Sequence, residues 1–400
     1  MKQEWKKEKL GKVYDVRDGT HDSPKYVKEG FALITSKNLK SNGLNFNNVN
    51  YITEQDYIDI NKRSKVHRGD VLFAMIGTIG NPVVIIDEPD FAIKNVALFK
   101  VPKNQDSFFL KYYLDSNVVM DRMSKDAKGS TQKFVGLGYL RNFEIPLPPL
   151  PEQERIVAIL DKAFTAIAKA KSNAEQNLKN TKELFESYLQ NVFENKGMDW
   201  EEKTLGEVAT FRNGMNFTKS SKGEKIKIVG VKDFQNSFWV PFETLETAIL
   251  DGKLSDVDLL NEGDILVVRS NGNPQLIGRT LLAREVIGKV SHSGFTIRIR
   301  LNTFNIDPIY LCNFLKITKT RKILVDGGNG VGIKSLNQGS LSALIIPFPK
   351  SLTKQQTIVQ KLDALSEKTK KLEAIYRQQL NDLEELKKSI LQKAFAGELC

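Results

Sequence analysis

The sequence predicts an α+β protein made of two copies of one plan, in which a strand-rich globular block is followed by one long helix. Three observations lead to this fold class: an internal repeat, short β-branched runs in two blocks, and two long stretches with heptad spacing. With 400 residues, 40% hydrophobic and 27% charged, the chain has enough apolar material for about two packed domains and too much for a disordered chain.

The internal repeat has more than one register. At a spacing of 195 residues, six positions are identical. They are Trp5, Leu10, Gly11, Val13, Arg17 and Gly19, which recur as Trp200, Leu205, Gly206, Val208, Arg212 and Gly214. A shift of one residue aligns Gly69-Asp70 with Gly263-Asp264, and a spacing of 202 aligns Leu160-Asp161 with Leu362-Asp363. The chain is therefore a tandem duplication of about 200 residues.

The first part of each copy is rich in strands. Residues 1–150 and 199–352 contain short apolar runs bounded by Gly, Asn and Pro, such as Val71-Leu72-Phe73 and Ile265-Leu266-Val267-Val268. Shorter helices are expected at about 107–123 and 307–324. Each globular block is thus predicted to be α+β with a strand-rich core.

The second part of each copy is a long helix. Residues 152–195 contain neither Pro nor Gly, and their apolar residues follow the alternating spacing of a coiled coil, which residues 354–396 repeat. Prolines hold the chain extended before each helix. They are Pro146, Pro148, Pro149 and Pro151, and then Pro347 and Pro349. The predicted segments are 1–150, 151–198, 199–352 and 353–400.

The charge of the chain favours a polyanionic partner. The net charge is +11 and the pI about 9.3. The four segments carry +5, 0, +4 and +2 in order, so most of the excess lies in the two globular blocks. Two cysteines and three scattered histidines give neither a disulfide framework nor a zinc site, and no signal or membrane segment is present, which favours the cytoplasm.

No catalytic motif is complete. Pro89-Asp90 and Lys94 resemble part of a metal-dependent nuclease site, but Ala92 stands where the second acid belongs, so a turn before a strand is expected. The glycine-rich residues 326–332 lack the Lys-Ser/Thr that follows a phosphate loop and are expected to form a surface loop. Asn81-Pro82-Val83 and Asn273-Pro274-Gln275 lack the second proline of a methyltransferase motif.

Several segments resemble one family across essentially the whole chain. Residues 145–157, IPLPPLPEQERIV, closely resemble the junction motif of the specificity subunits of type I restriction-modification systems. Residues 389–399, SILQKAFAGEL, are similar to their carboxyl-terminal segment, and Leu205-Gly206-Glu207-Val208 with Arg212-Asn213-Gly214 to the opening of their target recognition domains. The second junction, at 346–356, lacks the double proline and the Glu, which concerns only the geometry of that hinge.

The resemblance implies a fold and a set of partners. It implies two target recognition domains, 1–150 and 199–352, that each read one half of a split double-stranded DNA sequence, and two long antiparallel coiled-coil helices that space them with pseudo-twofold symmetry. Two methyltransferase subunits and the restriction nuclease-translocase subunits would supply all chemistry. S-adenosylmethionine, ATP and Mg²⁺ are then expected on those subunits, and no cofactor or metal in this chain.

Candidate DNA contacts lie in the loops after the repeated Gly and after the repeated Gly-Asp strand. Arg pairs with guanine, and Asn or Gln with adenine, in the major groove. The candidates in the first block are Arg17, His21, Lys25, Lys37 and Thr78. Those in the second are Arg212, Asn216, Lys219, Lys232, Arg269, Asn271, Asn273, Gln275 and Arg279.

Two other functions remain open at this point. A duplicated coiled-coil scaffold would not bind DNA, so that salt-dependent DNA binding would exclude it. An enzyme that modifies DNA itself would need an acidic metal site or a methyltransferase motif, and activity of the purified chain with Mg²⁺ or a methyl donor would reveal it.

Overall fold

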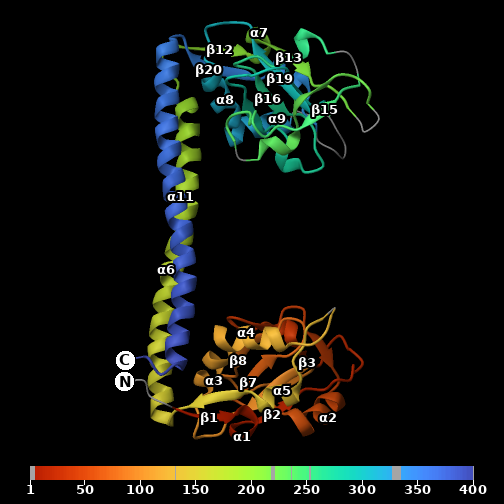
Figure 1. The fold of residues 1–400 in the computed structure, drawn as a ribbon, viewed down its shortest axis with the longest axis vertical. Helices are drawn as coiled ribbons and strands as arrows, with labels where there is room; N and C mark the ends of the chain where they lie inside the picture. The colour runs from red at the N-terminus through yellow and green to blue at the C-terminus, as the bar shows by residue number, and fades with distance from the viewer. Residues whose placement is uncertain are drawn as a thin grey trace. The chain divides into compact units, whose positions relative to one another are not determined.

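The chain forms two compact units, each with strands, short helices and parts of two long helices (Figure 1). The computed structural model describes residues 5–130, 132–217, 221–235, 237–251, 254–326 and 335–399. Unit 1 comprises Met1–Glu175 and Arg377–Cys400, and unit 2 comprises Gln176–Tyr376. The predicted long helices are α6 (Leu150–Glu194) and α11 (Leu352–Phe395), and each contributes residues to both units.

Unit 1 is built on a four-stranded antiparallel sheet with the strand order β2-β10-β7-β8. Its strands are β2 (Asp15–Asp18), β10 (Val96–Lys100), β7 (Val71–Ala74) and β8 (Gly80–Val84). A second sheet, β6-β3-β9, contains one parallel pair, β3 with β9. Its strands are β6 (Asn50–Ile52), β3 (Phe31–Ile34) and β9 (Phe91–Ile93). Two ribbons join β1 (Lys6–Lys9) to β11 (Glu144–Leu147) and β4 (Leu39–Lys40) to β5 (Gly43–Leu44).

The four-stranded sheet of unit 1 separates two apolar cores, because successive side chains of a strand point to opposite faces. On β10, Ala97 and Phe99 belong to the core that contains residues of the helices. Val96 and Leu98 belong to the core shared with β3 and β9. A strand with both faces buried has no polar alternation, which explains the continuous apolar runs of the sequence.

Among its described residues, unit 1 has five short helices. They are α1 (Leu10–Val13), α2 (Glu54–Ser64), α3 (Ser107–Leu114), α4 (Asn117–Asp126) and α5 (Leu137–Asn142). Side chains cap the first turn of two of them, α2 and α3. Thr53 accepts from the Asp56 N–H, and Asp106 from the Phe109 N–H. The helix predicted over 107–123 is two helices, since Ser116 has an extended backbone and its hydroxyl donates to Tyr113 O at 2.7 Å.

Unit 2 repeats the sheets of unit 1, which confirms the predicted duplication. The four-stranded sheet has the strand order β13-β19-β16-β17, and the three-stranded sheet β15-β14-β18 again has one parallel pair. The strands of the first are β13 (Ala209–Asn213), β19 (Thr296–Leu301), β16 (Ile265–Val268) and β17 (Thr280–Leu282). Those of the second are β15 (Thr247–Ile249), β14 (Lys225–Val229) and β18 (Val290–His292).

The remaining elements of unit 2 follow the same order. The ribbon β12 (Trp200–Thr204) with β20 (Ile345–Pro349) repeats β1 with β11. The helices are α7 (Leu205–Val208), α8 (Pro308–Lys316), α9 (Thr318–Asp326) and α10 (Gln338–Ser342), with the 3-10 turns η2 (Val231–Phe234), η3 (Asp256–Asp258) and η4 (Pro274–Leu276). The helix predicted over 307–324 is broken at Ile317, which has an extended ψ of 130°. In unit 1, η1 (Ser36–Asn38) matches η2.

The repeated glycines of the sequence have a steric cause. A Cβ atom at Gly19 would lie 2.2 Å from Ile93 O, and one at Gly214 would lie 2.2 Å from Ser293 O. No side chain fits at either position, because the backbone at Ile93 passes close to Gly19 and the backbone at Ser293 passes close to Gly214. The repeat therefore preserves a close backbone contact in both units.

Each long helix is anchored to its unit by a fully buried glutamine near its start. Gln153 Nε2 donates to Pro148 O at 2.8 Å, and its Oε1 accepts from the Asp106 N–H at 3.0 Å. Gln355 makes the equivalent bonds at the start of α11, each at 2.8 Å. The glutamine amide thus links the start of the long helix to the extended segment before it. It also links the long helix to the residue that caps α3 in unit 1 or α8 in unit 2.

The parts of the long helices within unit 1 run antiparallel. Arg155 of α6 donates to Leu399 O at 2.8 Å, and Lys171, further along α6, pairs with Glu384, earlier in α11, at 2.6 Å. In unit 2, Phe193 of α6 and Leu362 of α11 belong to the same apolar core as the sheet. No helix in the described ranges is long and apolar enough to cross a membrane.

Replacement of the first anchoring glutamine is expected to destabilise unit 1. Gln153→Leu leaves the Asp106 N–H and the Pro148 carbonyl buried without a partner, and each such group costs about 1–3 kcal/mol. We expect the free energy of unfolding in a denaturant titration to fall by about 2–4 kcal/mol. Gln176→Leu, at an exposed position of α6, is the control and should stay within about 0.5 kcal/mol of wild type. Equal losses in both variants would contradict the anchoring role.

Candidate nucleic-acid interface

One end of each four-stranded sheet carries most of the loops that the sequence singles out. In unit 1, Asp18 pairs with Ala97 and Ala74 with Val96, so β2 and β7 end beside the start of β10. In unit 2, Asn213 pairs with Ile297, and Val268 with Thr296, which gives the same arrangement. We call the loops at this end the sheet-end surface. It comprises residues 19–25, 36–38, 75–79, 94–95 and 127–136 in unit 1, and 214–217, 231–235, 269–279, 293–295 and 335–337 in unit 2.

Two loops of the unit 1 surface are held together by their backbones. The Gly77 N–H donates to Lys133 O at 2.9 Å, and the Val135 N–H donates to Met75 O at 3.0 Å. The second loop is closed by two bonds between Lys128 and Phe134, at 3.0 and 2.8 Å. The loop after β7, which carries Thr78, is thus fixed against the loop between α4 and α5.

Glycines at two positions permit this close packing. Gly77 has φ +79° and Gly129 has φ +102°, a region that side chains disfavour. A Cβ at Gly129 would also lie 2.2 Å from Gln132 O. The loop therefore presents its side chains from a defined backbone conformation.

The exposed side chains on these two loops are polar or basic. They are Thr78, Lys128, Gln132 and Lys133, with Phe134 at 40% exposure among them. Neither Lys128 nor Lys133 forms an ion pair with another residue in the described ranges. Two unneutralised ammonium groups and two neutral donor-acceptor groups on one rigid surface suit a polyanion that also offers hydrogen bonds.

Asn95 joins two other segments of the unit 1 surface. His21 Nδ1 lies 2.8 Å from Asn95 Oδ1, and Ser36 Oγ donates to Asn95 O at 3.3 Å. These contacts bring His21 close to η1, which contains Lys37. Lys25 and Lys37 are both exposed. Asp18, which is buried, contacts His21 Nε2 at 2.8 Å and also pairs with Arg63, so His21 is oriented by its neighbours.

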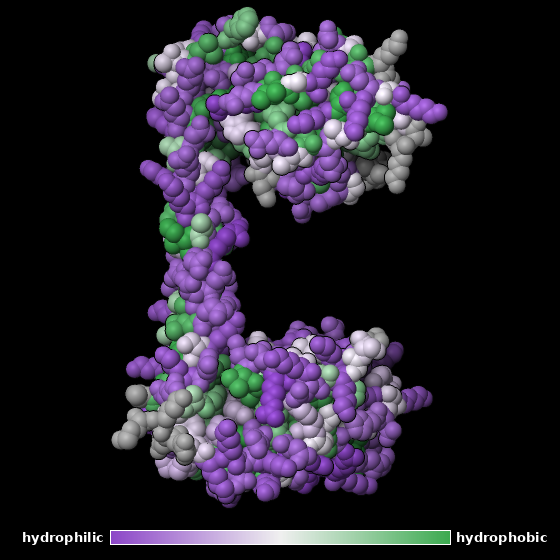
Figure 2. All heavy atoms as spheres, in the orientation of Figure 1, coloured by the Kyte–Doolittle hydropathy of each residue, from purple (hydrophilic) through white to green (hydrophobic). Residues whose placement is uncertain are grey.

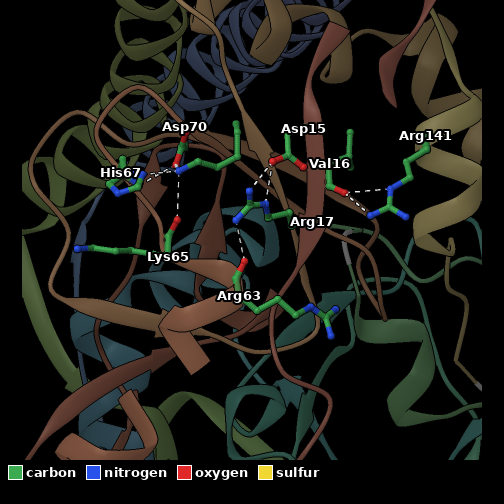
Figure 3. Close-up of polar contacts among 9 residues, drawn as sticks. Asp15, Val16, Arg17, Arg63, Lys65, His67, Asp70 and Arg141 are labelled. Atoms are coloured by element: carbon green, nitrogen blue, oxygen red, sulfur yellow. Dashed lines mark hydrogen bonds and ion pairs between the residues drawn. The ribbon is translucent and has the colours of Figure 1, made fainter. Parts of the chain in front are cut away.

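Arg17 lies within the sheet and not on the surface loops (Figure 3). Its Nε and Nη2 donate to Asp15 Oδ2 at 2.9 and 2.6 Å, and its Nη1 donates to Arg63 O at 2.9 Å. The hydrogen bond to Asp15 raises the pKa of the Arg17 guanidinium. Figure 3 also shows Arg141, which donates to Val16 O at 3.0 and 2.7 Å. The structure therefore uses both guanidinium groups to hold β2 in place.

In unit 2 the four predicted loop residues lie together. The Leu336 N–H donates to Arg269 O at 2.8 Å, which matches the Val135–Met75 bond of unit 1. Asn271 Oδ1 accepts from the Asn273 N–H at 2.8 Å, and Asn273 Oδ1 accepts from the Gln275 N–H at 3.0 Å, so the two amide oxygens shape the turn. Within the described ranges, the side chains of Arg269 and Gln275 form no hydrogen bond.

The other predicted residues of unit 2 have different roles. Arg279 donates to Phe234 O and Gln235 O at 3.1 and 2.8 Å, and so fastens the loop to η2. Lys232 forms an ion pair with Glu246. Asn216 is exposed and lies against Gly294, where a Cβ would be 2.2 Å from its Oδ1. Lys219 and the glycine-rich residues 327–332 lie outside the described residues.

Arg212 is exposed but contacts a cluster of buried polar residues in unit 2, which contains Asp258, His292 and Arg298. Its Nε donates to Asp258 Oδ1 at 2.7 Å. Burial alone would raise the pKa of Asp258, but hydrogen bonds from Arg212 and the Ser255 N–H lower it. Burial and the nearby charge of Arg298 lower the pKa of His292 to about 3. His292 Nδ1 lies 2.9 Å from the Thr296 hydroxyl, which itself donates to a carbonyl, so the neutral imidazole is the donor.

Acid is expected to destabilise unit 2 through His292. The folded pKa of about 3 lies below the ordinary value of 6.5, so below pH 6.5 the unfolded chain binds a proton that the folded chain does not. The free energy of unfolding should therefore fall between pH 6.5 and 3, by at most about 1.4 kcal/mol per pH unit.

Denaturant titrations of wild type and His292→Asn at several pH values test this, because the variant should lack that contribution. The same pH slope in His292→Asn and wild type between pH 6.5 and 4.5 would contradict the assignment.

The rejected enzyme motifs have structural roles. Pro89 and Asp90 lie in the loop before β9, as expected for a turn that leads into a strand. Lys94 Nζ donates to Ser23 Oγ at 2.5 Å. Within the described ranges, no group of three His, Cys, Asp or Glu side chains could hold a metal ion.

Lys128, Gln132 and Lys133, together with residues 94–95 and 293–295, lie on the sheet-end surface but are not among the contacts predicted from sequence. These segments carry no repeated glycine and no Gly-Asp strand, which were the signals used. The basic and small residues of 128–133 were a usable signal, since such loops often bind polyanions. Their place beside residues 75–79 follows only from the long-range pairing in the folded chain.

A family model, a related sequence and two solved structures all connect this chain with type I restriction-modification systems. The family model for the type I restriction modification DNA specificity domain matches residues 2–178 and 198–382. A candidate type I restriction enzyme MjaX specificity subunit from Methanocaldococcus jannaschii is 24% identical, over 99% of this chain and 94% of its own length. The HsdS subunit of Thermoanaerobacter tengcongensis is 21% identical, with a TM-score of 0.62 over 99% of this chain and 97% of its own. A chain from a study of complex assembly and conformational transition in the type I R-M system is 20% identical and reaches 0.76, over 99% and 98%.

Proposed function

Because the chain belongs to the type I restriction modification DNA specificity family, we propose that it is the DNA-binding subunit of such a system and reads the two halves of a bipartite target. The observation that carries this proposal is the sheet-end surface, which occurs once in each unit on the same frame. Two similar frames with different side chains suit two different half-sites on one duplex.

The two surfaces offer different chemistry to DNA. In unit 1, Lys128 and Lys133 suit phosphate contacts, and Thr78 and Gln132 can contact phosphate or base edges. In unit 2, the side chains of Arg269 and Gln275, which have no hydrogen-bond partner among the residues that the structure describes, suit guanine and adenine in the major groove, at about 1–3 kcal/mol for each bidentate pair. Arg17, Arg212 and Arg279 support the surfaces from behind, because their guanidinium groups already hold the chain's own oxygens.

The chemistry of the system is assigned to partner subunits. We propose that this chain is non-catalytic and docks two methyltransferase subunits, and through them the restriction nuclease-translocase subunits, in the cytoplasm. S-adenosylmethionine, ATP and Mg²⁺ would bind to those partners. The long helices expose apolar side chains, visible as green patches in Figure 2, and these suit contact with a protein partner. The exposed residues are Leu184, Leu372, Ile375 and Leu386.

Removal of the two lysines in unit 1 is expected to weaken DNA binding at all sequences. In the complex with methyltransferase subunits, Lys128→Ala/Lys133→Ala should reduce the slope of log K against log salt by about 2, since each phosphate contact contributes about 0.9. Binding titrations at several salt concentrations measure the slope. Lys103→Ala, an exposed lysine that follows the opposite end of β10, is the control. A wild-type complex whose DNA affinity does not depend on salt would favour the scaffold alternative.

Removal of the two free side chains in unit 2 is expected to affect one half-site only. Arg269→Ala/Gln275→Ala retains the turn made by Asn271 and Asn273, and should weaken binding to the intact target by at least about 30-fold, since two contacts of about 1–3 kcal/mol each are lost. Methylation sequencing of cells that carry the system identifies both half-sites. We expect relaxed sequence preference in the half-site read by unit 2 and no change in the other.

Arg284→Ala serves as the control for this experiment. Arg284 follows the opposite end of β17 and lies over Trp239 at 5.3 Å. Its removal should leave both half-sites unchanged. A change in both half-sites caused by Arg269→Ala/Gln275→Ala would contradict separate reading by the two units.

A further inference from the structure

The sheet-end surfaces expose three phenylalanines among polar and basic residues: Phe134 in unit 1, and Phe217 and Phe295 in unit 2. Of the two in unit 2, Phe295 is the more exposed. Phe295 of unit 2 is 61% exposed and Phe134 of unit 1 is 40% exposed. The two positions are not equivalent in the repeat. By strand register, Asn95 takes the place of Phe295 in unit 1, and by the loop bonds, Ser335 takes the place of Phe134 in unit 2. An exposed aromatic ring therefore occurs in both units but at different points of the surface.

Phe295 is held rigidly between predicted contact residues. Its carbonyl accepts from the Arg269 N–H at 2.8 Å, and its N–H donates to Ser293 Oγ at 3.2 Å. The preceding Gly294 donates to Met215 O at 2.8 Å and is packed by the Asn216 side chain. The backbone at Phe295 thus joins the loop of Arg269 to the loop of Asn216.

Phe134 has a comparable setting in unit 1. Its N–H donates to Lys128 O at 2.8 Å, and its carbonyl accepts from the Lys128 N–H at 3.0 Å. A Cβ at Gly129 would lie 3.4 Å from Cδ1 of the ring, so one edge of the ring is close to the Gly129 backbone.

We infer that Phe295 and Phe134 each contact the C5-methyl group of a thymine in the half-site read by their unit. Thymine is the only base of ordinary DNA that offers an apolar group in the major groove, and Phe is one of the side chains that suit it. Each ring is partly exposed in its own unit. Arg269 and Asn216 near Phe295, and Lys128 and Lys133 near Phe134, suit DNA more than an apolar protein surface. This inference rests on the proposed DNA-binding function.

Replacement of single thymines by deoxyuridine tests the inference, because the change removes only the methyl group. With half-sites known from methylation sequencing, each thymine is replaced in turn and the affinity of the complex with methyltransferase subunits is measured. In each half-site, one position should lower the wild-type affinity by about three- to fivefold, the value of one buried methyl group. Phe295→Ala should remove this loss in the unit 2 half-site only, and Phe134→Ala in the unit 1 half-site only.

Two further variants complete the experiment. Phe295→Leu keeps an apolar side chain and should retain most of the affinity difference between thymine and deoxyuridine. A variant that failed to fold would lose this difference. Phe304→Ala removes a 95% exposed ring that follows the opposite end of β19, and should leave the discrimination intact. Thermal unfolding of each variant confirms that the fold is retained.

The possible outcomes separate this inference from the proposed function. The inference is overturned if Phe295→Ala and Phe134→Ala still distinguish thymine from deoxyuridine, or if a half-site has no thymine whose methyl group matters. The proposed function survives that result if Lys128→Ala/Lys133→Ala and Arg269→Ala/Gln275→Ala still weaken DNA binding. If none of these variants affects DNA binding, both the inference and the proposed function fail.

Discussion

One inner strand of each four-stranded sheet, β10 in unit 1 and β19 in unit 2, is hydrogen-bonded to an antiparallel neighbour on both sides. We call it the central strand. Both neighbours therefore run in the same direction, and their carboxyl ends lie beside the start of the central strand. This constraint gathers loops from distant parts of the chain at one end of the sheet. The contact between residues 75–79 and 127–136, the position of His21 beside Asn95, and the pairing of Arg269 with Phe295 all depend on it.

The two units keep identical residues where the backbone leaves no alternative. Gly19 and Gly214 lie under a passing strand, and Gln153 and Gln355 supply both a donor and an acceptor to buried main chain. The exposed side chains Thr78, Lys133 and Gln275 of the sheet-end surface are under no such restriction, since within the described ranges none of them is hydrogen-bonded or ion-paired to its own unit. A stable frame and an adjustable surface are thus separated within each copy.

Much of the frame is predictable from sequence because it is encoded by local pattern and by repetition. The strands, the long helices and the extended segments before them follow from apolar spacing and proline. The breaks at Ser116 and Ile317 do not, since each depends on how the flanking helices pack. The roles of the arginines are equally hidden: a guanidinium has five donors, and sequence alone does not show that Arg17 and Arg279 donate to carbonyls of their own unit.

Unit 1 is discontinuous in the chain, whereas unit 2 is the single segment Gln176–Tyr376. Leu391 and Ala394 lie in the core of unit 1, and Phe395 packs its ring on Phe109 and Tyr113. During synthesis on the ribosome, residues 1–175 therefore emerge with part of their apolar core uncovered until residues 391–395 have been translated. Unit 2 uses no residue beyond Tyr376, so a chain that stopped there would leave the apolar core of unit 1 partly exposed.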